Sequence, residues 1–204
     1  MKRTLMLLGC FIVLGTTTLA SVDIASPERN SLNIKVGFGT GDVDYDRENN
    51  YDYDISLSNT SLNLEYLASY NQGLELGVGT GIARNSVDDW DWEVTTIPVY
   101  AIARYKWSTN SDWDPYVFAN LGYAFSNFDY SYDNNSGYSY SREVTGGLYS
   151  ALGLGAEYKE KFSVEIYWNK SNLGYEEHNS SGDKYDGDFD VDMVTLALGY
   201  RLDI

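Results

Sequence analysis

The chain has few basic residues, with 14 Lys and Arg against 30 Asp and Glu, and its formal net charge is −16. A protein that binds nucleic acid needs a basic surface to neutralise phosphates, so this balance excludes nucleic acid as a partner. Aromatic residues make up 15% of the chain and hydrophobic residues 43%. That content is too high for a disordered acidic chain, so a folded protein is expected.

Cysteine occurs only once, as Cys10, within an N-terminal segment that resembles an export signal. Basic residues at positions 2 and 3 precede an apolar run over residues 5–15, which is too short to span a bilayer. We predict a cleaved signal peptide over residues 1–20, a short lead over residues 21–30 and one domain over residues 31–204. A lipoprotein cleavage box ending at Cys10 is the alternative. On the main interpretation the exported chain has neither disulfides nor a thiol nucleophile.

Glycines recur at every second position in GFGTGDV (residues 37–43) and GVGTGIA (residues 77–83). The spacing does not match the dinucleotide fingerprint, which needs its third glycine three positions after the second. It does not match the P-loop either, which ends in Gly-Lys followed by Ser or Thr before a helix. A period of two is typical of a β-strand, in which alternate side chains face opposite sides. We expect these glycines to face inward and to leave room for larger inward side chains, namely Tyr100, Phe118, Tyr149 and Tyr167.

The same alternation recurs in eight segments of roughly ten residues, the length that crosses a bilayer when a strand is tilted. The segments cover residues 32–38, 62–70, 74–83, 97–107, 117–125, 148–158, 162–168 and 194–204. Connections alternate between short turns (71–73, 108–114, 159–161) and long polar loops (near 41–56, 84–95, 126–145, 171–192). This pattern predicts an all-β protein, an eight-stranded antiparallel up-and-down transmembrane β-barrel with both termini at the short-turn end.

A soluble barrel would instead turn its apolar face inward. Against it, the second face is rich in glycine, and aromatics gather at the strand ends, as expected at two membrane interfaces. The aromatics are Tyr70, Tyr105, Trp107, Tyr158, Phe162 and Tyr200 near the short turns, and Phe38, Phe125 and Trp168 near the loops. We therefore expect the apolar face to contact lipid, with Leu64, Val78, Val99, Leu121, Leu152, Ile166 and Leu196 outward.

The last six residues, GYRLDI, place apolar Leu202 and Ile204 three and five positions after Gly199. In this ending and its architecture the chain resembles the small eight-stranded outer-membrane barrels of the OmpA/OmpX type, although it ends in Ile rather than Phe. The resemblance implies insertion by the barrel-assembly machinery into the cell outer membrane, with contact to its lipid and lipopolysaccharide. It implies no catalytic residue and no cofactor.

Charged residues also occur on the face that should point inward, where an isolated charge would be costly and should be paired. These are four bases and four acids, Lys35, Glu65, Glu75, Arg104, Lys106, Glu157, Glu165 and Arg201. We expect the pairs Lys35 with Glu65, Glu75 with Arg104, and Arg201 with Glu165. The eight would form an ionic plug near the short-turn end; a narrow gated channel through it is the alternative.

The long loops hold twenty of the thirty acids, interleaved with Tyr and Trp. Four interpretations remain open: a solvated repulsive surface, a surface protein partner bound through the aromatic side chains, divalent cations, such as Ca²⁺, that bridge lipopolysaccharide phosphates, or extended loop hairpins with aromatic cross-strand pairs that need no partner. No loop has the EF-hand spacing, so we assign no metal site.

The single histidine, His178, lies two residues before Ser180, the H-x-S spacing found in small-barrel lipid A deacylases. Glu176 or Glu177 could orient the histidine in such a triad. The surrounding residues depart from that family's motif and His178 falls in a predicted loop. We therefore predict a protein that is not an enzyme, with lipid A modification as the alternative function.

Overall fold

The structure, a computed structural model, describes residues 27–45, 55–70, 73–87, 93–133, 139–179 and 184–204. The predicted signal peptide lies outside these residues. The strands are β1 (Arg29–Tyr45), β2 (Ile55–Ser69), β3 (Leu74–Val87), β4 (Glu93–Lys106), β5 (Trp113–Asp133), β6 (Ser139–Thr145), β7 (Gly147–Tyr158), β8 (Phe162–Asn179) and β9 (Lys184–Asp203). The described residues include no helix long and apolar enough to cross a membrane.

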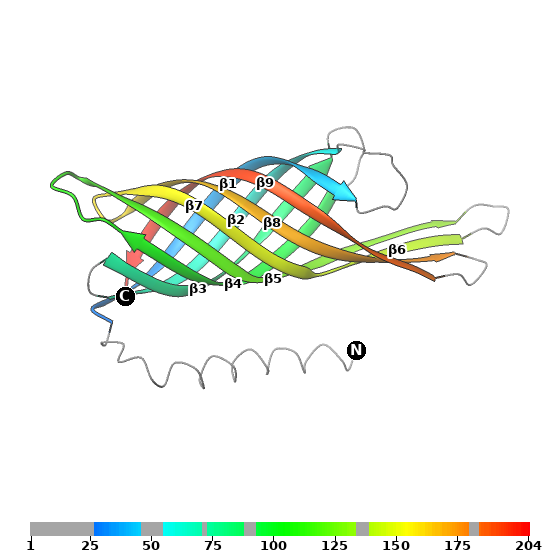
Figure 1. Ribbon diagram of the computed structural model, residues 1–204, viewed down its shortest axis with the longest axis horizontal. Helices are drawn as coiled ribbons and strands as arrows, with labels where there is room; N and C mark the ends of the chain where they lie inside the picture. The colour runs from blue at the N-terminus through cyan, green and yellow to red at the C-terminus, as the bar shows by residue number, and fades with distance from the viewer. Residues whose placement is uncertain (1–26, 46–54, 71–72, 88–92, 134–138, 180–183) are drawn as a thin grey trace.

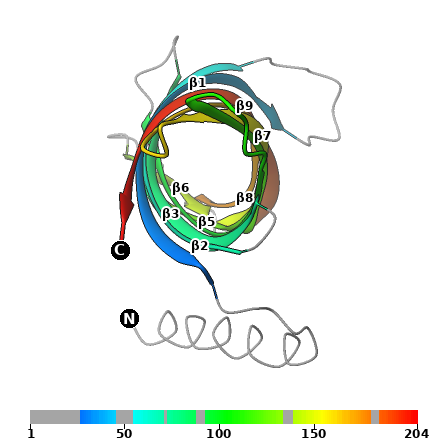
Figure 2. The same cartoon turned by 90° about the vertical axis from the view of Figure 1, so that its left-hand side faces the viewer.

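All neighbouring strands pair antiparallel, and the sheet closes on itself because β1 pairs with both β2 and β9. Strands β6 and β7 are separated only by Gly146 and together form one wall strand between β5 and β8. The wall therefore has eight strands, which confirms the predicted antiparallel barrel (Figures 1 and 2). Strand β1 begins two residues before the predicted domain boundary, because Arg29 already pairs with Ser69.

The outer surface of the barrel carries a continuous belt of exposed apolar side chains. All seven positions predicted to face lipid point outward, with exposed fractions between 44% (Leu64) and 62% (Leu152). Water would strongly disfavour so much exposed apolar surface, whereas lipid does not. The apolar face is therefore the outer one, and the soluble alternative is wrong.

Aromatic side chains flank this belt at the short-turn end in close pairs, either within one segment of chain or across adjoining strands. Ring centroids lie 5.1 Å apart for Tyr105 and Trp107, and 5.2 Å apart for Phe162 and Tyr200. Trp113, which the sequence analysis left in a turn, begins β5 and lies 4.9 Å from Tyr158. Such rings, apolar with one polar edge, suit the boundary between lipid and water.

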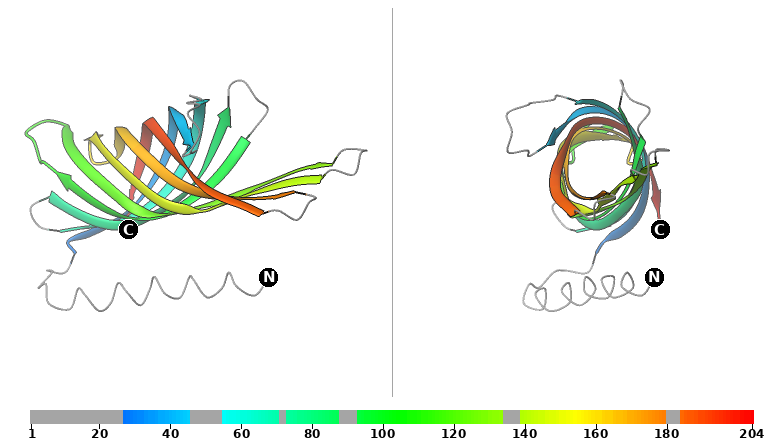
Figure 3. Two further views of the ribbon diagram at one scale, coloured as in Figure 1. Left: turned by 45° about the vertical axis from the view of Figure 1, so that its right-hand side comes forward. Right: turned by 90° about the vertical axis from the view of Figure 1, so that its right-hand side faces the viewer.

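The predicted long loops are wrong in extent, because the strands run far into them. Residues 128–133 of β5 pair with β6, β6 pairs with residues 174–179 of β8, and these pair with residues 184–188 of β9. We call these four segments the outer sheet; it projects beyond the rest of the barrel (Figure 3). Polar Tyr-, Ser- and Asp-rich sequence forms strands here because cross-strand backbone pairing does not require an apolar face.

A bulge separates the outer sheet from the membrane-spanning wall. The β5 partner of Gly147 is Ala124, whereas that of Val144 is Phe128, so three residues of β5 face two on the other strand. Val144 and Tyr149 are both buried although an odd number of positions separates them. A Cβ on Gly147 would lie 1.5 Å from the Asn172 carbonyl oxygen, so only glycine permits this approach.

Inward glycines make room for aromatic rings, as predicted. A Cβ on Gly79 would lie 2.5 Å from the Tyr100 ring, and one on Gly153 would lie 2.7 Å from Phe118. No phosphate-binding role is needed to explain these glycines, because the neighbouring rings occupy the space beside them. The aromatic side chain also covers glycine backbone that would otherwise lack packing.

The lipid belt gives a test of membrane depth. Arg in place of Leu121, in the middle of β5, should cost about 2–4 kcal/mol of unfolding free energy, whereas Arg in place of Tyr105, at the belt's edge, should cost about 0–1 kcal/mol. Both side chains face outward, at 61% and 41% exposure, so the interior is unchanged. Urea unfolding in lipid vesicles measures both values, and equal costs would contradict a bilayer around this belt.

Candidate functional site

The barrel interior is the candidate site, and its side chains are arranged in layers along the barrel. From the short-turn end these are an open vestibule, the ionic plug, a layer of aromatic rings, a small polar chamber and an apolar cap. Because successive residues of a strand alternate between lipid and interior, each layer is built from one or two positions on many strands.

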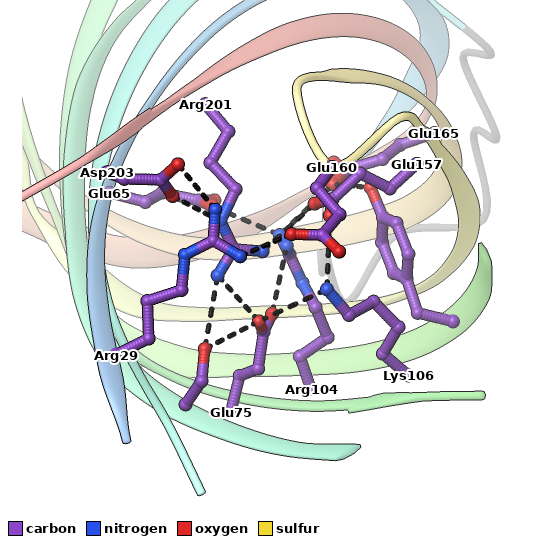
Figure 4. Close-up of polar contacts among 12 residues, drawn as sticks. Arg29, Glu65, Glu75, Arg104, Lys106, Glu157, Glu160, Glu165, Arg201 and Asp203 are labelled. Carbon is purple, nitrogen blue, oxygen red and sulfur yellow. Dashed lines mark hydrogen bonds and ion pairs between the residues drawn. The ribbon is translucent and has the colours of Figure 1, made fainter. Parts of the chain in front are cut away.

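The inner half of the ionic plug consists of two bases and two acids that are at least 97% buried. Three of them, Glu65, Arg104 and Glu165, are labelled in Figure 4. Lys35 Nζ lies 2.7 Å from Glu65 and 2.6 Å from Glu165. Arg104 reaches the same two carboxylates at 3.4 and 3.3 Å. Each charge therefore has two opposite partners, which offsets the large cost of removing it from water.

The second half of the plug lies toward the short-turn end and has the same composition. Arg201 lies 2.7 Å from Glu75 and 3.0 Å from Glu157, and Lys106 lies 3.7 and 3.1 Å from the same acids. Arg104 also reaches Glu75 at 3.4 Å and so joins the two halves. Each half contains two bases and two acids, so the formal charges within each half sum to zero.

All eight predicted charges thus lie in one network, and two of the three expected pairs, Lys35 with Glu65 and Arg104 with Glu75, are present. The expected pair of Arg201 with Glu165 is wrong. In the β8–β9 ladder Glu165 lies opposite Ala197, four residues from Arg201 and therefore about 13 Å away along the strand. Arg201 instead lies level with Lys161, whose carbonyl accepts its backbone N–H at 2.7 Å.

Sequence reasoning missed Tyr116, which completes the inner half of the plug. Its hydroxyl donates to Glu165 at 2.6 Å, and the Arg104 guanidinium lies 4.4 Å from its ring centroid. Tyr100 donates to Glu65 at 3.2 Å in the same way. The signal that was missed is the alternation of the strand, because Tyr116 lies two residues before Phe118 and therefore shares its inward face. The predicted strand began at residue 117 and so left Tyr116 out.

Above the plug lie the aromatic layer and the polar chamber. Ring centroids are 5.3 Å apart for Tyr100 and Tyr149, and 5.7 Å apart for Phe118 and Tyr167. The chamber has a volume of about 30 Å³ and is lined largely by neutral amides and hydroxyls, among them Asn59, Asn63, Asn85 and Asn169. That volume holds about two water molecules. The described interior is therefore filled by side chains and contains no wide pore.

An apolar cap closes the chamber on the side of the outer sheet. It consists of seven buried side chains, Val43, Leu57, Val144, Leu173, Phe189, Val191 and Met193. Sequence analysis placed five of these residues in predicted polar loops and left Leu57 and Met193 just outside the predicted strands, because the cap is formed largely by single apolar residues between polar ones. Their alternation in the short run Phe189, Val191, Met193 was the available signal.

A second ionic group, the rim cluster, lies at the short-turn end outside the membrane-spanning wall. Arg29 forms ion pairs with Glu160, in the turn between β7 and β8, and with Asp203, at the end of β9. The hydrogen bond from Arg29 holds the pKa of Glu160 below its ordinary value. These residues were not predicted to interact, since they lie 131 and 174 positions apart in the sequence.

The remaining predicted residues are placed as follows. Leu202 and Ile204 face outward, at 40% and 71% exposure, and Gly199 faces inward against Ser163 and Lys35. His178 lies in the outer sheet, where its backbone pairs with Ser141 and Lys184, and Ser180 lies outside the described residues. Within the described part of the chain, no group of three or more His, Cys, Asp or Glu could hold a metal ion.

Comparison with known proteins gives a family and several similar folds. The family model for the outer membrane protein beta-barrel domain matches residues 9–201. No curated protein matches the chain. Solved structures that resemble it include OprG from Pseudomonas aeruginosa, at 18% identity over 88% of this chain and 99% of that one, with a TM-score of 0.52.

Two further structures have the same architecture. Ail of Yersinia pestis, solved with the heparin analogue sucrose octasulfate, has 18% identity, covers 85% of this chain and 99% of its own, and gives a TM-score of 0.51. AlkL, solved in lipid bilayers, has 14% identity. The match covers 90% of this chain and 94% of that one, with a TM-score of 0.51. At such identities the likeness establishes the fold alone.

The corrected pairing in the plug gives a double-mutant test. Arg201→Gln and Glu157→Gln should each destabilise the barrel by about 3–5 kcal/mol, because each leaves buried charge underpaired. The double variant should recover part of the loss, with a coupling of about 0.5–3 kcal/mol. Unfolding of the refolded barrel in lipid measures all three values.

The matched control is the pair Arg201→Gln and Glu165→Gln, which has no direct contact in this structure. Its coupling should be smaller than that of Arg201 with Glu157. The reverse order would show that the assigned register of β8 and β9 is incorrect.

The rim cluster gives a test by titration. Arg29→Gln should raise the pKa of Glu160 toward the ordinary value for glutamate, whereas Lys161→Gln, in the same turn, should leave it nearly unchanged. A lowered carboxyl pKa stabilises the fold above the ordinary pKa, and this contribution is lost as the pH falls through the Glu160 pKa. Carboxyl NMR of the labelled protein in nanodiscs measures the shift; equal values in wild type and Arg29→Gln would refute the pairing.

Proposed function

Because this chain belongs to the outer membrane protein beta-barrel domain family, we propose that it is a surface-binding protein whose barrel anchors the outer sheet. The family indicates an outer-membrane location. In our proposal the short-turn end lies on the periplasmic side and the outer sheet lies outside the cell. On this proposal the protein is neither an enzyme nor a transport channel, and the sheet binds the partner.

The observation that carries the proposal is the open edges of the outer sheet. The pairing of β5 with β4 ends at Asn127, so among the described residues the segment 128–133 pairs only with β6. The pairing of β9 with β1 ends at Phe189, so residues 184–188 pair only with β8 in the same part of the chain. Unpaired strand edges carry free N–H and C=O groups that can bind an extended segment of another molecule.

The charge of this region supports a partner with basic groups. Asp186 and Asp188 are exposed on the outer face of β9, and Asp190 and Asp192 continue the same face toward the membrane. Lys170 of β8 pairs with the last two, at 2.7 and 3.4 Å. A negative field of this kind steers basic partners and is screened by salt.

The filled interior supports the same proposal, because it leaves little room for a transported solute. A solute would have to pass the apolar cap, a chamber of about 30 Å³, two pairs of aromatic rings and the eight charges of the plug. Eight strands enclose an interior that side chains just fill. A barrel of this kind serves as a membrane anchor.

The proposal predicts that the outer sheet can be removed without loss of the barrel. Because Phe128 pairs with Val144 and Gly174 with Asp188, Asn-Gly linkers can replace residues 129–143 and 175–187 as tight hairpins. Cells that display this shortened variant should lose attachment to surfaces that bind the wild type, such as cultured cells or a layer of basic protein. The attached fraction, measured at low and high salt, gives the readout.

A heat-modifiability gel provides the folding control, since a folded barrel changes mobility on boiling. Equal attachment by wild type and folded short variant would contradict the proposed role of the sheet. Bilayer recordings of the wild type address the other alternative, because steady conductance at the level of a general porin would show that the plug does not close the barrel.

A further inference from the structure

The free edge of β9 is the border of the outer sheet whose chemistry is best defined. Residues 184–188 pair with β8 on one side, and no described strand pairs with them on the other, because the ladder with β1 ends at Phe189. They belong to the part of the sheet that projects beyond the barrel (Figure 3). Three residues of this edge, Asp186, Gly187 and Asp188, indicate what kind of strand can extend it.

The hydrogen bonding of β9 shows which residues present free polar groups at this edge. The N–H of Arg201 donates to the Lys161 carbonyl on the β8 side. Successive residues of a strand direct their N–H and C=O groups to opposite sides, so even-numbered residues of β9 direct theirs away from β8. The register of β9 with β8 is constant over residues 184–200, without a bulge. Asp186 and Asp188 therefore direct their N–H and C=O groups out of the free edge.

The same two residues carry carboxylates on the outer face of the sheet. Asp186 and Asp188 are both exposed. The residues directly opposite them on β8 are Glu176 and Gly174, so neither carboxylate has a base directly across this ladder. A strand added at the free edge would place its own side chains opposite these carboxylates, with Cβ atoms about 5 Å apart. Opposite charges at such positions stabilise a sheet, and like charges destabilise it.

The inner face of the edge is aromatic between these two positions. A Cβ on Gly187 would lie 2.7 Å from the Tyr175 hydroxyl, so the Tyr175 side chain covers this glycine. The Tyr175 ring lies beside Phe189, with centroids 6.3 Å apart. An added residue opposite Gly187 would therefore lie beside an aromatic surface, which favours a β-branched or aromatic side chain.

We propose that the β9 edge binds an extended basic segment of a partner protein, which adds to the outer sheet as an antiparallel strand. Lys or Arg at every second position of that segment pairs with Asp186 and Asp188, and a β-branched or aromatic residue between them packs beside Tyr175. Antiparallel addition continues the arrangement of every described ladder. The inference rests on the proposed surface function and specifies its edge and the partner's pattern. A second copy of this edge would bring like charges together and is disfavoured.

Synthetic peptides test this pattern on the protein in nanodiscs. A peptide in which Lys and Thr alternate should bind about two- to tenfold more tightly than one that repeats Lys-Lys-Thr-Thr. The two peptides have the same composition and net charge, but the second never places Lys at two positions separated by one residue. Equal affinities would show that the edge does not read the alternation, and the inference would be wrong.

Backbone methylation separates strand addition from charge attraction. In the alternating peptide, N-methylation of the Lys residues removes the donors that would face the carbonyls of Asp186 and Asp188, whereas N-methylation of the Thr residues removes donors on the far side. The first peptide should lose most of its binding, and the second should bind like the parent. Equal binding by the two methylated peptides would refute strand addition.

The carboxylates are tested by substitution in the protein. Asp186→Asn with Asp188→Asn should weaken binding of the alternating peptide by about two- to tenfold, because the backbone edge stays and both charges go. The matched control is Asp190→Asn with Asp192→Asn, which removes the same charge where β1 covers β9 and Lys170 pairs with both acids. The control should have a smaller effect. An equal loss would indicate a diffuse negative field and would overturn the inference.

Cell attachment distinguishes this inference from the function on which it rests. Folding of each variant is checked by heat modifiability, and Asp186→Asn with Asp188→Asn should reduce attachment. If cells without the outer sheet lose attachment while this variant keeps it, the surface function stands and the β9 edge is not its binding site. If cells without the outer sheet still attach, the proposed function fails, and the peptide measurements still decide whether the edge binds a basic strand.

Discussion

The pairing of four acids with four bases in a water-poor interior is the constraint on which the barrel depends. A single unpaired charge there would cost several kcal/mol, a large part of the stability of a domain this size. The strands must therefore hold Glu65, Glu165, Lys35 and Arg104 within contact distance of each other across the lumen. This requirement limits how far opposite walls can move apart, because the hydrogen bonds between these charges are lost when donor and acceptor separate or lose alignment.

Strand number, the lipid-facing side and the membership of the ionic plug could be predicted from the sequence, because each follows from an alternation visible within one strand. For Leu121 and for Lys35, the side of the wall on which the side chain lies follows from the neighbouring residues of the same strand. The partner of Arg201 could not be predicted in this way, since it depends on the stagger between β8 and β9. A shift of four residues along that ladder would bring Arg201 level with Glu165 without altering any local pattern, whereas in the observed register Arg201 contacts Glu157 of β7.

The sequence left the outer sheet as one of several open interpretations of the loops and gave no prediction of the apolar cap, for a related reason. A polar stretch pairs as a strand only when a partner of equal length lies beside it, and that length is a property of the whole hairpin. Val43 and Leu57 resemble isolated apolar residues of loops until their strands are brought around one axis, where they meet Phe189 and Met193. The rim cluster adds contacts between the two ends of the chain, which no local pattern encodes.

Three regions of the molecule are thus constrained differently. The wall must present apolar side chains to lipid, and the interior must pair its buried charges, whereas neither constraint applies to the outer sheet. The bulge at Gly146 and Gly147 lies on the boundary between the last two. Since register already changes by one residue at this point, a length change in the outer hairpin can be absorbed there without rotating Tyr149 or Leu152 to the wrong face. The outer sheet can therefore change in length and sequence while the wall and the interior beneath it keep their register.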